Sequence, residues 1–281
     1  MTLRVLVVTA VAVESDSVAT GLDGYAASAA RTWPSGPTLT RLHHPGPGAP
    51  APAPAGRHGS APGATGPGAA PRRRPAPDGP AAAPAVVVDV VAGGVGPAAA
   101  AVTAAAVLAT APYAYDLVVS AGIGGGFTPH APLGTVVVSD AIVAADLGAD
   151  TPDGYLAVEE LGFGRSVHLP PPALTRRIAA ALREGGQRHV VAPVLTLSTV
   201  TGTAARTAEL SARHPRAAAE AMEGFGVAEA AAAHGVPAVE IRAVSNAVGP
   251  RDRAAWRIGE ALDSLQNAFR LLGTTVFLED L

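Results

Sequence analysis

The chain has 281 residues, of which 48% are hydrophobic and only 4% aromatic, so alanine and valine must fill most of its core. The formal net charge is -3 and no basic stripe stands out, which argues against nucleic acid as a partner. The absence of cysteine excludes disulfides and cysteine metal sites, and it suits a cytoplasmic protein. All 20 basic residues are arginine, which excludes a lysine Schiff base and a P-loop lysine.

The N-terminal third predicts a strand, a helix and a long insertion. Residues 3–11 are rich in valine and predict a core strand rather than a signal peptide, and a helix is expected over 14–22. Residues 34–84 are mostly Pro, Ala and Gly and cannot bury enough apolar surface to offset chain entropy. We therefore expect a disordered insertion there, within a single domain spanning 1–281.

Beyond the insertion, predicted strands and helices alternate. The expected strands are 86–91, 117–120, 134–140, 190–197 and 238–244, and the expected helices are 98–110, 174–183, 220–234 and 254–272. Glycine turns are expected after the first two of these strands. The alternation predicts a three-layer α/β/α fold with a central mixed, mostly parallel sheet. The uncharged run 90–111 is broken by glycines and a proline, so no membrane span is expected.

Polar residues and glycines gather where the predicted strands end. Glu14 follows the first strand, Gly122 and Gly124 follow the third, and Ser245 and Asn246 follow the last. Ligands bind at the carboxyl ends of strands in such sheets, so we expect these residues to meet at one site.

The sequence lacks several local motifs of cofactor chemistry. The stretch AGIGGGF does not meet the G-x-G-x-x-G pattern, because Phe127 stands at the last position. No P-loop and no G-x-S-x-G elbow occur. The eight histidines are scattered, with no H-E-x-x-H and no dense carboxylate cluster, so no metal site is predicted.

Five stretches carry a resemblance to a known family: VVTAVAVESDSV, VAGGVGPAAAA, VVSAGIGGGF, LGTVVVSDAIVAADLGA and AEAMEGFGVAEAAAAHGVPAVEIRAVSNAVG. In this order they resemble the nucleoside phosphorylase/nucleosidase superfamily, in particular its hydrolytic branch. Methylthioadenosine/S-adenosylhomocysteine nucleosidases have a Met-Glu pair and an R-A-x-S-Asp ending. Here Asn246 replaces that Asp, which is more similar to futalosine hydrolases, the nucleosidases that release hypoxanthine in menaquinone biosynthesis.

The resemblance implies roles for individual residues. Glu14 would activate the attacking water, and Glu223 would accept hydrogen bonds from ribose hydroxyls. Met222 would pack on the sugar, and Asn246 would face the purine. Further substrate contacts are implied for Gly122, Ile123, Gly124, Val200 and Ser245. No metal or organic cofactor is implied, and a homo-oligomer is expected.

The amide at position 246 bears on the choice of purine. An Asn side chain offers one donor and one acceptor, and these can pair with the ring N–H and keto oxygen of hypoxanthine. Adenine would leave one of these two hydrogen bonds unmade, and a buried polar group without a partner costs about 1–3 kcal/mol of binding free energy. Arg251 or Arg165 could pair with the benzoate that futalosine carries, and Trp256 or a phenylalanine could stack on the base.

Three other functions stay open. A methylthioadenosine-type nucleosidase would cleave adenine nucleosides, and a purine nucleoside phosphorylase would depend strictly on phosphate. A non-catalytic nucleoside-binding protein would bind without turnover. Structural roles are also open, because Glu14 could stabilise a helix N-terminus and Asn246 could cap a helix.

Overall fold

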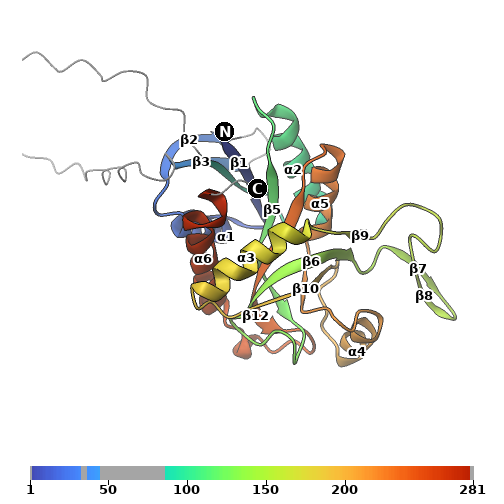
Figure 1. Ribbon diagram of the computed structural model, residues 1–281. Coiled ribbons are helices and arrows are strands. Elements are labelled where there is room, and N and C mark those ends of the chain that lie inside the picture. Colours follow the sequence, from blue (N-terminus) through green and yellow to red (C-terminus); the bar gives the residue numbers. More distant parts are fainter. Residues whose placement is uncertain (1, 33–36, 45–85, 279–281) are drawn as a thin grey trace, which may run out of the picture.

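A large mixed sheet forms the middle layer of the molecule (Figure 1). The structure, a computed structural model, describes residues 2–32, 37–44 and 86–278. The sheet order is β11-β10-β6-β12-β5-β1-β4-β3-β2, with β9 paired to β6. Its strands are β1 (Leu3–Thr9), β2 (Ala26–Thr32), β3 (Thr38–His44), β4 (Val86–Ala92), β5 (Leu117–Gly126), β6 (Val136–Ala144), β9 (Val167–His168), β10 (His189–Thr196), β11 (Ala219–Ala221) and β12 (Ala238–Ala247). A separate hairpin joins β7 (Gly148–Thr151) to β8 (Gly154–Ala157).

The strand directions explain where the site forms. β5, β1 and β4 are parallel neighbours, and β12 runs parallel to β5 on its other side. β12 meets β6 antiparallel, and β3 joins β4 antiparallel. The short strand β11 pairs with β10 and also, antiparallel, with β5, so this half of the sheet closes on itself. The closure brings β11 against the carboxyl end of β5.

Helices cover both faces of the sheet, and the residues of β1 are apolar on both faces for this reason. Val5 and Val7 join one apolar cluster and Leu6 and Val8 join another, so both faces of β1 are buried. One face is covered by α1 (Ala12–Gly21), α3 (Pro172–Glu184) and α6 (Ile258–Thr274). The opposite face is covered by α2 (Pro97–Thr110) and α5 (Gly224–Ala233). α4 (Ala204–Arg213) packs beside the closed end through Leu210, and two short 3-10 helices are η1 (Arg253–Ala255) and η2 (Val276–Leu278).

The three-layer fold is therefore confirmed, and most predicted elements lie within a few residues of their expected ranges. The helix expected over 220–234 was wrong at its start, because Ala219–Ala221 forms β11 and the helix begins only at Gly224. The glycine turn expected after 117–120 was also wrong, since β5 continues to Gly126. In both places pairing with distant strands overrides the local preference.

Part of the segment 34–84, which was expected to be a disordered insertion, forms a strand. Thr38–His44 forms β3, which pairs with β4 and buries Leu39 and Leu42. These two leucines supply enough apolar surface for a buried strand, although the average composition of residues 34–84 is poor in large apolar side chains. Residues 33–36 and 45–85 lie outside the described residues. Among the described helices, none has the length and apolarity to cross a bilayer.

Candidate active site

A cavity of about 310 Å³ opens at the carboxyl ends of β1, β5 and β12, beside β11. The predicted site residues that line it are Glu14, Ile123, Gly124, Val200, Met222, Glu223, Ser245 and Asn246. They come from five separate segments, which the fold brings together at this cavity. Gly122 does not line the cavity, although it contacts residues that do.

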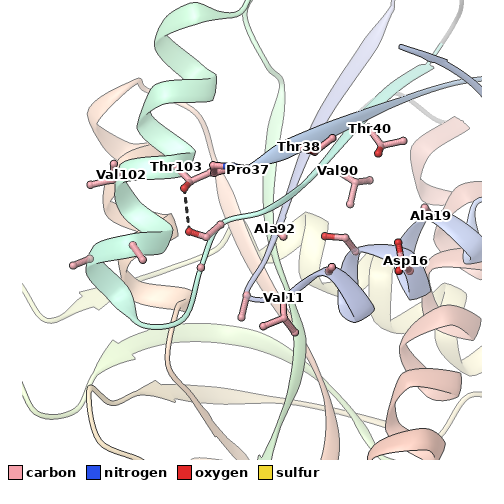
Figure 2. Close-up of a pocket in the computed structure, with 17 residues that line it drawn as sticks. Val11, Asp16, Ala19, Pro37, Thr38, Thr40, Val90, Ala92, Val102 and Thr103 are labelled. Carbon is pink, nitrogen blue, oxygen red and sulfur yellow. Dashed lines mark hydrogen bonds between the residues drawn. The ribbon is translucent and has the colours of Figure 1, made fainter. Parts of the chain in front are cut away.

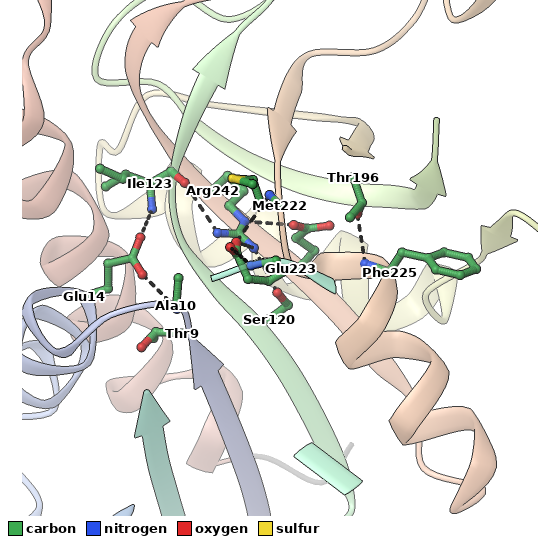
Figure 3. A network of polar contacts seen from close by, with 12 residues as sticks. Thr9, Ala10, Glu14, Ser120, Ile123, Thr196, Met222, Glu223, Phe225 and Arg242 are labelled. Atoms are coloured by element: carbon green, nitrogen blue, oxygen red, sulfur yellow. Dashed lines mark hydrogen bonds and ion pairs between the residues drawn. The ribbon is translucent and has the colours of Figure 1, made fainter. Parts of the chain in front are cut away.

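Glu14 lies in the first turn of α1, is 3% exposed, and is held by backbone amides. Its Oε2 accepts hydrogen bonds from the N–H groups of Ala10 at 2.9 Å and Val11 at 3.2 Å. Its Oε1 accepts from the N–H of Ile123 on β5 at 2.9 Å. The carboxylate therefore bridges the start of α1 and the end of β5, and it faces the cavity in one orientation (Figure 3).

Gly122 leaves room for this carboxylate. A Cβ on Gly122 would lie 2.5 Å from Oε1 of Glu14 and 2.7 Å from Nη1 of Arg242. Both distances are shorter than real Cβ contacts, so a side chain here would displace two charged groups. Gly122 thus supports the site from behind rather than touching the space inside it.

Arg242 on β12 is the centre of a buried ionic network (Figure 3). Its Nη2 lies 3.2 Å from Oε2 of Glu223 and donates to the hydroxyl of Ser120 at 3.1 Å, while its Nε donates to Oε1 of Glu240 at 2.8 Å. Burial lowers the pKa of Arg242, but the nearby carboxylates of Glu240, Glu223 and Glu14 outweigh this and raise it overall. Burial raises the pKa of Glu240. Arg242 opens the R-A-x-S ending of the family resemblance, but no role was predicted for it, since it stands in a mostly apolar strand.

Glu223 is positioned by this arginine and by a glycine turn. It is 5% exposed and directly precedes α5. Its Oε1 accepts a hydrogen bond from the N–H of Gly96 at 3.1 Å, at the start of α2. Arg242 therefore holds Oε2 and the turn holds Oε1, and the residue lines the cavity next to Met222.

A β-bulge places both Ser245 and Asn246 at the cavity. Val244 pairs with Gly124 and Asn246 pairs with Gly125, so Ser245 is the extra residue of β12. The hydroxyl of Ser245 donates to Oδ1 of Asn246 at 2.9 Å, and Nδ2 of Asn246 donates to the carbonyl of Ala247 at 3.0 Å. The bulge and these contacts fix the amide at the edge of the cavity.

Glu220 on β11 is a buried carboxyl group that was expected to lie in a helix and was not predicted to belong to the site. It lines the cavity and is 4% exposed. Its Oε1 accepts a hydrogen bond from the N–H of Thr201 at 2.9 Å. Its Oε2 is buried without a hydrogen-bond partner among the described residues, as is the hydroxyl of Thr201. Burial raises the pKa of Glu220, and the contacts from Thr201 and the charge of Arg206 oppose that rise only in part.

The two candidate arginines lie in different places. Arg251 lines the cavity, with its guanidinium carbon 5.3 Å from the ring centre of Trp256, which also lines it. Arg165 instead pairs with the exposed Glu229, 3.0 Å away on α5. Phe127 and Phe225 are buried in apolar clusters. Among the described residues, no group of three His, Asp or Glu side chains could hold a metal ion.

Residues 82–276 match the model of the Phosphorylase superfamily. A futalosine hydrolase of Streptomyces coelicolor is 70% identical over 154 residues, which cover 55% of this chain and 63% of that protein. A futalosine hydrolase of Acidothermus cellulolyticus is 46% identical over 159 residues, which cover 57% of this chain and 65% of that protein. The chain thus spans somewhat less than two thirds of the length of these relatives.

Solved structures share the fold. A methylthioadenosine/S-adenosylhomocysteine nucleosidase of Colwellia psychrerythraea, in complex with adenine, superimposes with a TM-score of 0.67 at 20% identity, covering 98% of this chain and 96% of that one. A futalosine hydrolase of Helicobacter pylori gives a TM-score of 0.70 at 13% identity and 97% coverage of both chains. The sequence match covers more than half of the chain, and the shared fold agrees with it. The chain belongs to the phosphorylase superfamily.

Proposed function

We propose that the protein hydrolyses the N-glycosidic bond of futalosine and releases hypoxanthine and dehypoxanthine futalosine, a step of menaquinone biosynthesis. The observation that carries this proposal is the convergence of Glu14, Glu223 and Asn246 on one cavity. The similarity to futalosine hydrolases of two other bacteria supports the same substrate. The substrate-contact roles of Met222 and Val200 belong to the proposal too, because both residues line that cavity.

Glu14 is the proposed general base. It takes a proton from water while the water oxygen attacks C1′ of the ribosyl group. The bond from C1′ to the purine nitrogen breaks, and its electron pair leaves with the purine. Three backbone N–H groups hold the carboxylate in place, so little reorganisation is needed before reaction.

Glu223 is the proposed partner of the ribose hydroxyls. A carboxylate accepts such hydrogen bonds strongly, but only if it keeps its charge and position in a buried site. Arg242 provides the compensating charge, and the N–H of Gly96 fixes one oxygen. That turn is where a phosphorylase would need anion-binding donors, and here its amide is engaged by Glu223, which favours hydrolysis over phosphorolysis.

Asn246 and Arg251 are proposed to recognise the two ends of the substrate, Asn246 the purine and Arg251 the benzoate. The amide of Asn246 suits an oxopurine, since it offers a donor and an acceptor together. Arg251 lies at the same cavity, beside Trp256, and would pair with the benzoate of futalosine. The position of Arg165 in a surface ion pair outside the cavity makes it the weaker candidate.

Hypoxanthine release from futalosine, with and without phosphate, tests the proposal. Release without phosphate is expected, and Glu14→Gln should reduce kcat by about 10²–10⁴-fold because the base is lost. Asp23→Asn, at an exposed position two residues after α1, should leave kcat unchanged. Release only with phosphate would instead establish a phosphorylase, and cleavage of methylthioadenosine in place of futalosine would establish the adenine-specific nucleosidase. Binding of futalosine without any turnover would establish a non-catalytic binding protein.

A homo-oligomer in the cytoplasm is part of the same proposal. A groove of about 940 Å³ lies next to the cavity, and Ala10 and Val11 line both (Figure 2). Val102 on its rim is 71% exposed and Val11 is 40% exposed. A second copy of the chain would cover these valines and complete the wall of the cavity. Light scattering should show a dimer or larger oligomer that Val102→Glu dissociates, whereas a monomeric native protein would contradict the proposal.

A further inference from the structure

The proposed reaction leaves one proton without a donor. When the bond from C1′ to the purine breaks, its electron pair stays on the purine, and protonation of a ring nitrogen makes the purine a better leaving group. Position 246 holds an amide, which is not an acid at ordinary pH. If the proposed hydrolysis is correct, another group near Asn246 must supply the proton.

The sheet register places Glu220 opposite Asn246. Gly125 on β5 pairs with Glu220 of β11 on one side and with Asn246 of β12 on the other. Residues paired across neighbouring strands present their side chains to the same face. Because Gly125 has no side chain, the other two side chains approach each other over it. A Cβ on Gly125 would lie 3.3 Å both from Cγ of Glu220 and from Nδ2 of Asn246, and 3.0 Å from Cγ2 of Val248.

The surroundings of Glu220 favour the uncharged acid. The side chain is 4% exposed, and Oε2 has no hydrogen-bond partner among the described residues. Glu223, by contrast, is equally buried but paired with Arg242. Burial without such a partner raises the pKa of Glu220, whereas the single N–H from Thr201 orients the group through Oε1.

We propose that Glu220 is the general acid that protonates the departing purine. Its Oε2–H donates the proton to a ring nitrogen of the hypoxanthine as the bond to C1′ breaks, and the carboxylate that remains is reprotonated from solvent. Glu14 has meanwhile taken one proton from the attacking water, so the two protons balance. Asn246 orients the base by its amide, and Glu220 supplies the acid that position 246 lacks.

Glu220→Gln tests this role, because a Gln amide oxygen can still accept from the N–H of Thr201 while it has no acidic proton. With futalosine, kcat should fall by about 10²-fold or more and KM should change little. The alkaline fall of kcat, which reports ionisation of the acid in the wild-type enzyme, should disappear. Glu229→Gln on α5 is the matched control, and it should keep both kcat and the pH profile.

A second substrate separates acid catalysis from simple binding. With 4-nitrophenyl β-ribofuranoside, the phenolate departs without protonation, so Glu220→Gln should retain the wild-type rate. Three results for Glu220→Gln would each overturn the role of Glu220. They are a wild-type kcat with futalosine, a kcat that still falls at alkaline pH as in the wild type, and equal losses of rate on both substrates. If the wild-type protein releases no hypoxanthine at all, the proposed function itself fails, and the two failures are thus distinguishable.

Discussion

Arg242→Met should be strongly destabilising, because the arginine compensates two buried carboxylates. It contacts Glu223 at 3.2 Å and Glu240 at 2.8 Å, and all three side chains are almost fully buried. Methionine fills much of the same volume but leaves the carboxylates unpaired. Breaking a buried pair by removing one partner costs about 3–5 kcal/mol, a large share of the about 5–15 kcal/mol that stabilises a typical protein.

Urea unfolding followed by circular dichroism measures this loss. Burial raises the pKa of Glu240 and the charge of Arg242 opposes that rise, so Arg242→Met raises this pKa further above its unfolded value. The variant therefore loses stability as pH rises through the raised pKa of Glu240, and its deficit relative to the wild type should shrink as the pH is lowered toward 5. Glu240→Gln should partly restore stability in the double variant at pH 7.

The control for this series is Arg257→Met, since Arg257 is 47% exposed at its side chain and its carboxylate partner is 3.7 Å away. Such exposed pairs contribute about 0–1 kcal/mol, so stability should hardly change. A loss below about 1 kcal/mol in Arg242→Met at pH 7, or a deficit that does not depend on pH, would refute the reasoning.

Three further predictions concern activity. Gly122→Ala would place its Cβ 2.5 Å from Oε1 of Glu14, so kcat should fall by about 10²–10⁴-fold with a smaller change in KM, as steady-state kinetics would show. Asn246→Asp should raise cleavage of methylthioadenosine relative to futalosine by about tenfold or more, because it removes the paired donor that suits an oxopurine; an unchanged ratio would contradict that role. Arg251→Met should raise KM for futalosine by about tenfold or more but leave KM for inosine unchanged, because inosine lacks the carboxylate.

Much of the fold could be predicted because its signals are local. The valine-rich run of β1 and the alanine-rich helices α2 and α5 need only nearby residues to be recognised. β3 was missed because its partner β4 follows only after residues 45–85, and the register that buries Leu39 and Leu42 is a long-range property. Leu39 and Leu42 are three positions apart and join apolar clusters on opposite faces of the sheet, so the strand shows no apolar alternation.

The same distinction applies to the site. Glu14, Glu223 and Asn246 were recognised from a family resemblance, and the structure brings them to one cavity. Arg242 was not recognised as an organising residue, since only Glu240 is near it in the chain, and its other partners lie on β5 and directly before α5. Glu220 was missed because three residues of β11 are held extended by β10 and β5, against an alanine-rich context that favours helix.

The glycines of β5 show how the cavity is built. Glycine inside a strand often marks a close approach of neighbouring groups rather than a turn. Gly122 makes room for Glu14 and Arg242, and Gly125 makes room between Glu220 and Asn246. Three residues of extended chain separate these positions by roughly 10 Å. In the proposed reaction, one strand therefore serves the water and ribose near Gly122 and the purine near Gly125, and a side chain at either position should disturb a different part of that reaction.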